Sequence, residues 1–386
     1  MLPLKRLGLT LDTVGTVARG HPWVYREGLI GRANTGDPVE LVDGKGKRVA
    51  WGLYEGGPIA VRVLGKDPMP MANLLAARLG AAFKLRLGFA RDWGDTDTFR
   101  MCHGEGDGLP GLVIDRYSDT CVIRLYAKAW ERYIGDTVDV LRAQGVQRVW
   151  RRFGVGRVDD REGGEALLGG EPPDVLIVRE HGMKMLARLK VGQKTGLFLD
   201  QREHRRKVRV WSEGRSVTNL FSYNGGFSIA AALGGATRVT TVDLAPAAVE
   251  DARETFRING IDPGAHAFEV ADVFTYRGDR SDLVVCDPPS LSHDKDADGA
   301  ARKAYKDLHR HIQPMVGGWL ATSSCSARLP YERWEEAVRE GLGHGGLGAT
   351  RWSRLYTGTE PPDHPVGLSH PEGRYLKFML LARREE

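Results

Sequence analysis

The second half of the chain alternates short apolar runs with segments that carry apolar residues at helical spacing. The apolar runs are "SVTNLFSY", "RVTTVDL", "AFEVADVF", "SDLVVCDPP" and "GWLATSSC". Between two of them, "PAAVEDARETFRING" has Pro246 near its start and Gly260 at its end, as helices commonly do. This alternation of strands and helices predicts an α/β fold with a parallel, doubly wound sheet from about residue 187 onward.

The first half has a different pattern. Residues 1–72 alternate apolar runs with Gly-rich turns, which predicts short strands in a small β-barrel. The segment "MANLLAARLGAAFKLRLGFARDW" predicts one helix, and strands and a further helix follow it. A chain of 386 residues exceeds the about 250–300 residues of a single core. We therefore expect three domains: a small β-barrel over 1–72, a small α+β domain over 73–186 and the doubly wound domain over 187–386.

Composition sets broad limits on the class of protein. An apolar fraction of 41% and a charged fraction of 27% are ordinary for a soluble globular protein. The first residues, "MLPLKRLGLT", lack the features of a signal peptide, and no apolar run approaches the roughly 18 residues of a membrane span. The four cysteines have no metal-like spacing. We therefore expect a cytoplasmic protein with reduced thiols, no bound metal and no membrane partner.

The charge is mildly positive. A net charge of +5 and a pI near 9.0 permit a polyanionic partner without requiring one. Positive charge is concentrated between Arg188 and Arg209, where eight Lys or Arg accompany two acidic residues. Such a segment is either a solvated helix face or a surface that meets phosphate groups.

Three predicted strand ends carry residues suited to a nucleoside, and ligands of such sheets lie beyond the carboxyl ends of the strands. The stretch "NLFSYNGG" (219–226) lets a ligand approach the backbone before a helix N-terminus. Asp243 ends the next strand, where a carboxylate accepts hydrogen bonds from the ribose of either NAD or S-adenosylmethionine. Asp272 follows a third strand and is either an adenine contact or an ordinary turn residue.

The stretch "VVCDPPS" (284–290) separates the two cofactors. An acid followed by two prolines has no function in a dinucleotide-binding fingerprint, whereas methyltransferases place a rigid loop here against the base to be methylated. An ordinary turn is the alternative. The stretch therefore favours S-adenosylmethionine.

The segments "KVGQKTGLFLDQREHR", "NLFSYNGGFSIAAALGGA", "VDLAPAAVEDARETFRING", "CDPPS" and "SSCS" together resemble the bacterial 23S ribosomal RNA cytosine-5 methyltransferases with a PUA-like N-terminal domain. The resemblance also includes "GHPWVYREGLI", "GEGDGLPGLVIDRY" and "DHPVGLSHPEGRYLKFMLL", so it spans nearly the whole chain. It implies a PUA-like domain, a central α+β domain and a Rossmann-like catalytic domain. It further implies S-adenosylmethionine as methyl donor, large-subunit ribosomal RNA as substrate and, often, a homodimer.

The resemblance also implies roles for individual residues. Asp243 would bind the ribose, Asp272 the adenine, and Asp287 would face the base. The residues expected around the donor are Gln201, Arg202, Phe221, Ser222, Tyr223, Asn224, Gly225, Asp243, Leu244, Asp272, Val273 and Asp287. The candidates for RNA contact are Trp23, Lys194, Arg205, Arg206, Pro288 and His364. Trp23 is equally expected as a half-buried barrel residue, and His364 as part of a loop turn.

Cys325, in "SSCS", is the candidate nucleophile. Carbon 5 of cytosine is too weak a nucleophile to take a methyl group unaided, and a thiolate that adds to carbon 6 activates it. An ordinary cysteine has a pKa of about 8.5, so a basic neighbour such as Arg328 would help. Asp287, with the Pro288 carbonyl on the exocyclic amine, would make carbon 6 more electrophilic. The alternative is that Cys325 is a buried strand-end residue; Cys102, Cys121 and Cys286 are expected to be structural.

Two departures from the family pattern bear on which nucleotide is the target. Histidines commonly follow "SSCS" in the family, whereas this chain has Ala327 and Arg328, and the loop after Asp287 has fewer aromatic residues. Three alternatives therefore stay open: a guanine-nitrogen methyltransferase on the same fold, a small-molecule methyltransferase, and a non-catalytic ribosome assembly factor.

Overall fold

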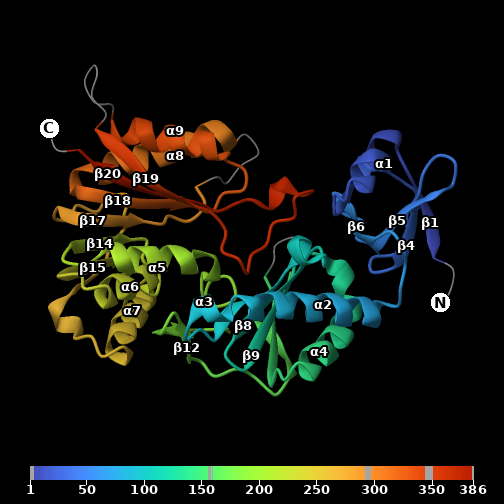
Figure 1. The fold of residues 1–386 in the computed structure, drawn as a ribbon, viewed down its shortest axis with the longest axis horizontal. Helices are drawn as coiled ribbons and strands as arrows, with labels where there is room; N and C mark the ends of the chain where they lie inside the picture. Colours follow the sequence, from blue (N-terminus) through green and yellow to red (C-terminus); the bar gives the residue numbers. More distant parts are fainter. Residues whose placement is uncertain (1–3, 155–157, 159, 292–296, 344–350, 385–386) are drawn as a thin grey trace. The chain divides into compact units, whose positions relative to one another are not determined.

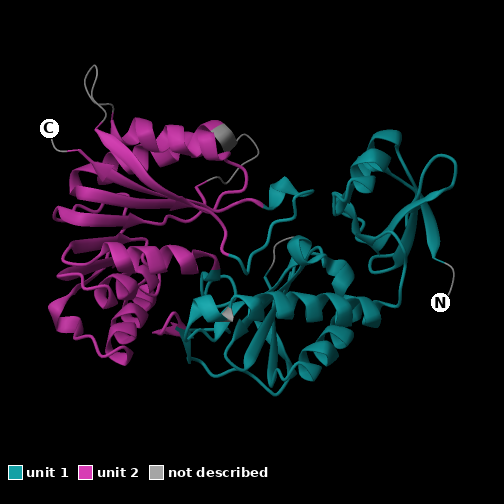
Figure 2. Cartoon of the chain, in the orientation of Figure 1, with its two compact units in different colours: residues 1–179, 187–199, 362–373 teal, residues 180–186, 200–361, 374–386 magenta. Residues whose placement is uncertain are grey.

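A computed structural model describes residues 4–154, 158, 160–291, 297–343 and 351–384. The chain forms two compact units (Figure 2). Unit 1 comprises Met1–Arg179, Ala187–Leu199 and Pro362–Gly373, and unit 2 comprises Glu180–Leu186, Asp200–Pro361 and Arg374–Glu386. Two short segments of the second half therefore belong to unit 1. The three domain boundaries expected from the sequence stay a prediction.

The first sheet of unit 1 has six strands in the order β2-β6-β5-β4-β1-β3. Its strands are β1 (Lys5–Leu9), β2 (Trp23–Tyr25), β3 (Leu29–Ile30), β4 (Pro38–Val42), β5 (Arg48–Tyr54) and β6 (Ile59–Gly65). The expectation of strands and turns alone is wrong for one segment, because helix α1 (Leu11–Ala18) lies between β1 and β2. Val14 and Val17, three positions apart, pack on the core of this sheet.

The second sheet of unit 1 has five strands in the order β11-β10-β9-β8-β7. Its strands are β7 (Thr98–His103), β8 (Leu112–Tyr117), β9 (Thr120–Leu125), β10 (Arg148–Arg152) and β11 (Gly164–Leu168). Its helices are α2 (Met71–Gly88), α3 (Ala90–Trp93) and α4 (Ile134–Ala143). The one helix expected after residue 70 is thus interrupted at Phe89, and Leu74, Leu75 and Leu79 of α2 are fully or almost fully buried.

The large sheet of unit 2 has seven strands in the order β16-β15-β14-β17-β18-β20-β19. Its strands are β14 (Ser216–Leu220), β15 (Arg238–Asp243), β16 (Ala267–Val270), β17 (Ser281–Cys286), β18 (Val316–Ser324), β19 (Trp352–Gly358) and β20 (Lys377–Arg383). The first five are parallel, as the sequence predicts, whereas β20 runs antiparallel to both β18 and β19. The fold is therefore α/β with an antiparallel edge.

Helices cover both faces of this sheet (Figure 1). The helices of unit 2 are α5 (Arg202–Trp211), α6 (Gly226–Leu233), α7 (Pro246–Ile258), α8 (Ala297–Ile312) and α9 (Tyr331–Leu342). One core includes Tyr305 of α8 and Trp334 of α9, and the other includes Ile229 of α6 and Phe256 of α7. The chain winds outward in opposite directions from β14 and β17, so the crevice expected to hold a ligand lies at the carboxyl ends of these strands.

Shorter elements complete the described part of the chain. A two-stranded sheet pairs β12 (Leu176–Glu180) with β13 (Met183–Ala187). The 3₁₀ helices are η1 (Arg26–Gly28), η2 (Gly104–Asp107), η3 (Lys128–Tyr133), η5 (Leu199–Gln201), η6 (Pro263–Ala265), η7 (Gln313–Met315) and η8 (Pro371–Gly373). Among the described residues, no helix has both the length and the apolar character that crossing a membrane requires.

Candidate functional site

The loop between β14 and α6 has an unusual backbone. Phe221 (φ 57°), Tyr223 (φ 48°) and Gly225 (φ 79°) are all in the left-handed region, which non-glycine residues rarely adopt. The Asn224 side chain donates to the carbonyl oxygen of Leu186 at 2.9 Å, which anchors the loop inside unit 2. Such strain persists only where the surroundings fix it, and it is typical of ligand-binding loops.

Asp243 lies at the carboxyl end of β15, beside this loop. One of its oxygens accepts the Tyr223 N–H at 2.7 Å and the other accepts the Ala245 N–H at 2.9 Å. These bonds hold the carboxylate in place, and each oxygen retains a lone pair for the hydroxyl groups of a ribose. The neighbouring Leu244 exposes 68% of its surface.

Asp272 follows β16 and serves as a turn residue. One of its carboxylate oxygens accepts the Phe274 N–H at 3.0 Å, and its carbonyl oxygen accepts the Tyr276 N–H at 2.9 Å. Val273 is buried in the core, so its side chain does not face a ligand. Phe274, which the sequence analysis missed, is 46% exposed and packs edge-on against Phe221 with ring centroids 5.6 Å apart.

These groups fit an adenosyl ligand. Asp243 supplies a fixed acceptor for the ribose, and exposed Leu244 and Phe274 supply apolar surface for an adenine ring at the same edge of the sheet. Gly225 allows the loop to pass close to α7, because an added Cβ atom would come within 2.7 Å of the Ala252 Cβ.

A second polar group surrounds Asp287, which follows β17. Gln201 donates from Nε2 to Asp287 Oδ1 at 3.0 Å, and the Ser323 hydroxyl donates to the same oxygen. The other end of the Gln201 amide accepts from His204 Nδ1 at 2.6 Å. Burial lowers the pKa of His204 to about 3, so this ring is neutral and its Nδ1 proton fixes the orientation of the amide. Ring stacking on Phe378, at 4.1 Å between centroids, holds His204 in place.

The structure brings Cys325 and Asp287 to adjacent strand ends. Cys286 of β17 pairs with Thr322 of parallel β18, so Asp287 and Cys325 leave the sheet at the same edge. Tyr305 of α8 reaches the same edge, because its hydroxyl lies 2.8 Å from the hydroxyl of Ser324, the residue before Cys325. Burial raises the pKa of Tyr305, and negative charge on Cys325 and Asp287 raises it further.

None of the four cysteines, all of which lie among the described residues, forms a disulfide, and they differ in exposure. Cys325 is partly exposed, whereas Cys102, Cys121 and Cys286 are completely buried. Burial raises the pKa of Cys121 to about 12 and raises that of Cys102 and Cys286 as well, which keeps these thiols protonated. Cys325 is therefore the thiol suited to chemistry.

The cation that forms a hydrogen bond with the Cys325 segment is not the one expected from the sequence. Arg328 is exposed. Lys377, at the start of β20, is 6% exposed, and its ammonium donates to the carbonyl oxygens of Ser326 at 2.6 Å and Tyr375 at 3.2 Å. The signal for this residue in the sequence is weak, a single lysine in the apolar run "YLKFMLL".

Two arginines at the start of α5 are buried. The Arg205 guanidinium forms two hydrogen bonds with Glu180, at 2.7 and 2.5 Å, and neither residue is more than 4% exposed. The expectation that Arg205 meets RNA phosphate is therefore corrected, because its charge is compensated inside the protein. Arg202 is also buried and lies 3.2 Å from Glu203. Arg206 keeps an exposed side chain, so it remains a candidate for RNA contact.

Pro288, the remaining RNA candidate of unit 2, is buried. Its ring is therefore part of the interior. The role expected for Pro288, accepting a hydrogen bond from the exocyclic amine of the base, requires only its backbone carbonyl. Pro289, the next residue, is exposed.

The candidates for RNA contact in unit 1 have internal partners. The Trp23 indole donates to Glu105 at 2.8 Å, and its ring lies edge-on to His370 at 4.3 Å between centroids. Lys194 places its ammonium 4.5 Å from the centroid of the Phe198 ring. The half-buried interpretation of Trp23 is thus the one that its contacts favour.

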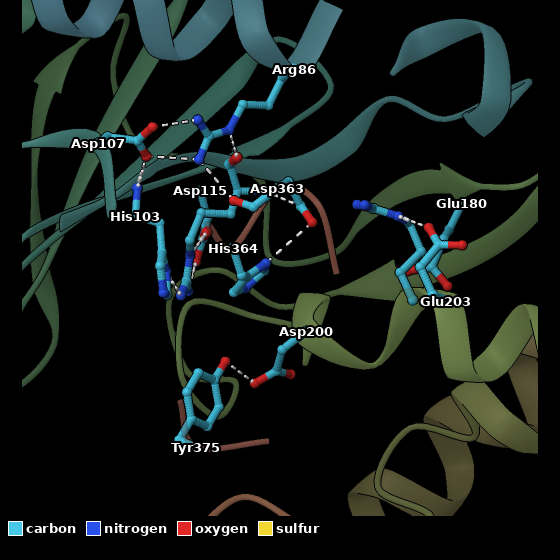
Figure 3. A network of polar contacts seen from close by, with 12 residues as sticks. Arg86, His103, Asp107, Asp115, Glu180, Asp200, Glu203, Asp363, His364 and Tyr375 are labelled. Atoms are coloured by element: carbon cyan, nitrogen blue, oxygen red, sulfur yellow. Dashed lines mark hydrogen bonds and ion pairs between the residues drawn. The ribbon is translucent and has the colours of Figure 1, made fainter. Parts of the chain in front are cut away.

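His364 is also part of the interior of unit 1. It is 2% exposed, and its Nδ1 lies 3.2 Å from Asp363 (Figure 3). The expectation of a contact between His364 and RNA is corrected, because the side chain belongs to a buried polar network. In that network Arg86 pairs with Asp107 through two hydrogen bonds of 2.6 and 2.7 Å.

Comparison with known proteins agrees with these observations. A family model for S-adenosylmethionine-dependent methyltransferases matches residues 155–341, and one for PUA-like domains matches residues 10–66. The ribosomal RNA large subunit methyltransferase of Deinococcus radiodurans is 37% identical over 98% of this chain and 97% of its own length. Ribosomal RNA large subunit methyltransferase I of Erwinia tasmaniensis is 34% identical over 96% of this chain and 98% of its own length. A solved structure of a proposed S-adenosylmethionine-dependent methyltransferase from Streptococcus mutans shares the fold, with a TM-score of 0.84 and 22% identity over 98% of this chain and 100% of that one.

Proposed function

The chain belongs to the family of S-adenosylmethionine-dependent ribosomal RNA large subunit methyltransferases, and from this premise we propose that it forms 5-methylcytosine in 23S ribosomal RNA. Membership of the family confirms the resemblance seen in the sequence and makes the chain an enzyme that uses S-adenosylmethionine. The target base and the residues that act on it are the proposal. The observation that carries it is a partly exposed thiol, Cys325, at the strand end next to Asp287.

In the proposed reaction Cys325 is the nucleophile. Its thiolate forms a bond to carbon 6 of the cytosine, which pushes the ring electrons toward carbon 5. Bound S-adenosylmethionine would supply an electrophilic methyl group: carbon 5 would form a bond to the methyl carbon as the methyl–sulfur bond breaks, which leaves S-adenosylhomocysteine. Loss of the carbon 5 proton to a water molecule then restores the ring double bond and expels the Cys325 sulfur as a thiolate.

Asp287 would hold the cytosine for this attack. Gln201 and Ser323 both donate to Asp287 Oδ1. Neutral His204 donates to the Gln201 amide oxygen, which turns the amide nitrogen of Gln201 toward the carboxylate. A carboxyl group fixed in this way can share a proton with ring nitrogen 3, which makes carbon 6 more electrophilic. The Pro288 carbonyl would accept from the exocyclic amine.

The donor site is proposed from the loop and its two acids. Asp243 would accept from the ribose hydroxyls, and Asp272 would meet the adenine amine. The other residues proposed around the donor are Gln201, Arg202, Phe221, Ser222, Tyr223, Asn224, Gly225, Leu244 and the backbone of Val273.

Further parts of the proposal concern the partners of the chain. The PUA-like domain within residues 1–72 would help to hold RNA, with the catalytic domain over 187–386 and a central domain over 73–186 between them. We propose a cytoplasmic location, where ribosomal RNA is found, and a homodimer, which sedimentation equilibrium would test.

The experiment uses ribosomal RNA from cells that lack this protein. The RNA is incubated with S-adenosylmethionine and wild-type protein, Cys325→Ala or the buried-thiol control Cys121→Ala, and modified nucleosides are identified by mass spectrometry. We expect 5-methylcytidine with wild type and Cys121→Ala and none with Cys325→Ala. Methylguanosine from both wild type and Cys325→Ala would overturn the proposal in favour of a nitrogen methyltransferase.

A trapping experiment tests the covalent step directly. RNA that carries 5-fluorocytidine cannot lose a proton from carbon 5, so a bond from Cys325 to carbon 6 would persist. We expect a protein–RNA adduct on a denaturing gel with wild type in the presence of the donor. Absence of the adduct, with binding of the donor and the RNA intact, would contradict a Cys325 nucleophile.

A further inference from the structure

Lys377 occupies an unusual position for a lysine. It is the first residue of β20 and pairs with Ser324, the residue before Cys325. Its side chain is 6% exposed, and its ammonium donates to the carbonyl oxygens of Ser326 and Tyr375. Lysine is rarely buried unless its charge has a function or a partner.

The two carbonyl bonds place the ammonium beside the Cys325 segment. Ser326 directly follows Cys325, and its carbonyl oxygen lies 2.6 Å from Lys377 Nζ. The Ser326 N–H donates to the Ser324 hydroxyl at 3.3 Å, so the backbone on both sides of Cys325 is held. Two neutral carbonyls do not balance a buried positive charge, which favours a nearby anion.

The charged groups around Lys377 act in the same direction. Burial lowers the pKa of Lys377, while the negative charges of Glu360, Cys325 and Glu332 raise it. The two glutamates therefore help to keep the ammonium protonated, and the electrostatic coupling to Cys325 is reciprocal. Two further groups lie at this edge: the Tyr305 hydroxyl, 2.8 Å from the Ser324 hydroxyl, and Asp287, whose negative charge disfavours a thiolate and so makes a compensating cation more important.

We propose that Lys377 is a positioning residue that stabilises the thiolate of Cys325 and orients the segment that carries it. The inference rests on the proposed function, because it assigns a partner to the proposed nucleophile. A thiolate is favoured beside a lysine ammonium, and Lys377 is a better source of that charge than exposed Arg328. The free charge of Arg328 is screened by solvent, whereas that of Lys377 is not.

The test measures the thiol itself before it measures catalysis. Cys325 is the one partly exposed cysteine, so native protein treated with iodoacetamide should be alkylated there, as peptide mass spectrometry verifies. The alkylation rate is followed from pH 6 to pH 10 in wild type, Lys377→Gln and Lys377→Arg. Gln keeps an N–H donor for the two carbonyls and removes the charge, whereas Arg keeps the charge.

We expect Lys377→Gln to move the midpoint of the alkylation profile about one pH unit upward, which makes alkylation at pH 7 about tenfold slower. The sign follows from the cation, since removing it disfavours the thiolate and more alkaline solution is needed to form it. Lys377→Arg should stay within about threefold of wild type at pH 7. Arg328→Gln, which removes the exposed cation, should leave the alkylation profile unchanged.

Catalysis supplies the second readout. The single-turnover methylation rate of Lys377→Gln should be about tenfold below that of wild type at pH 7. It should recover toward the wild-type rate near pH 9, because high pH restores the thiolate. Calorimetric binding of S-adenosylhomocysteine to each variant verifies the fold. If Lys377→Gln does not fold, the wild-type profile decides, because a Cys325 midpoint at or above about 8.5, the pKa of an ordinary cysteine, would overturn the inference, and a lower midpoint that Arg328→Gln leaves unchanged would support it.

The outcomes separate this inference from the proposed function. An unchanged alkylation profile in folded Lys377→Gln, together with inactive Cys325→Ala, would overturn the role of Lys377 and leave the nucleophile intact. Full activity in Cys325→Ala would overturn the nucleophile itself. A uniform loss of methylation at every pH in Lys377→Gln would show a merely structural residue.

Discussion

Asp243 shows how one carboxylate can serve both the loop and a ligand. Its two oxygens accept the N–H groups of Tyr223 and Ala245, so it supports a backbone that Tyr223 adopts at a positive φ. The same carboxylate stands at the strand end where a ribose is bound in such folds. We therefore expect its charge to matter both to the geometry of the loop and, in the proposed role as the ribose acceptor, to the affinity for the donor.

Asp243→Asn is expected to weaken binding of S-adenosylhomocysteine. The amide cannot accept at both positions and loses the charge-assisted bonds, which we expect to raise the dissociation constant about 10–100-fold in calorimetry. Asp262→Asn is the matched control, because Asp262 also accepts a backbone N–H, from Gly264 at 2.9 Å, but precedes β16 at the other edge of the sheet. Equal effects of the two substitutions would contradict a ligand-binding role for Asp243.

At the scale of single side chains, sequence patterns identify chemistry better than they identify partners. Asp243 and Asp287 were predicted from their place after apolar runs, and in the structure Asp243 ends β15 and Asp287 directly follows β17, at the carboxyl edge of the sheet. Arg205 was misassigned because its charge is visible in the sequence, whereas the buried Glu180 opposite it is known only from packing. Lys377 was missed because the pairing of β20 with β18 brings it to Cys325.

At the scale of elements, the loop before α6 depends on a close approach to α7. Gly225 has a φ of 79°, and an added Cβ atom would come within 2.7 Å of Ala252. Gly260 at the end of α7 has a similar φ of 74°, yet nothing lies within 4 Å of the position of an added Cβ atom. The two glycines thus share the backbone strain and differ in the steric contact.

Gly225→Ala is therefore expected to be more harmful than Gly260→Ala. In each variant the free energy of unfolding should fall by about 1 kcal/mol, because alanine disfavours the left-handed backbone conformation. In Gly225→Ala it should fall by a further ~1–3 kcal/mol, because the added Cβ atom collides with α7. Urea unfolding measures both losses, and we also expect weaker donor binding for Gly225→Ala alone. Indistinguishable unfolding free energies would show that the loop can move away from α7 at no cost.

The prediction of elements was most accurate where local pattern and packing agree. Strands β14, β17 and β18 are mostly buried where they run through the centre of the sheet, and apolar runs such as "DLVVC" show this directly in the sequence. Helix α1 was missed because Gly15 and several β-branched residues weaken its helical signal, and only Val14 and Val17 mark its buried side. The antiparallel direction of β20 was missed because strand direction is set by connections and not by composition.

At the scale of the whole molecule, residues far apart in sequence share one unit. Segment 362–373 belongs to unit 1 although the chain on both sides of it belongs to unit 2. Arg86 of α2 donates to the Asp363 carbonyl oxygen at 2.8 Å, and the Asp363 carboxylate accepts the Arg100 N–H at 2.8 Å (Figure 3). Arg86 is fully buried, so its charge depends on the two hydrogen bonds with Asp107.

Asp107→Asn is expected to release this segment as well as to lower stability. Loss of the carboxylate leaves a buried guanidinium without its counter-charge, which should cost about 3–5 kcal/mol of the free energy of unfolding. Asp139→Asn, which removes the partner of exposed Arg142, should cost less than about 1 kcal/mol. Because Arg86 also holds Asp363, hydrogen exchange should increase within 362–373 in Asp107→Asn and stay unchanged in Asp139→Asn. If exchange there is the same in both variants, the segment is held by contacts other than the Arg86 pair.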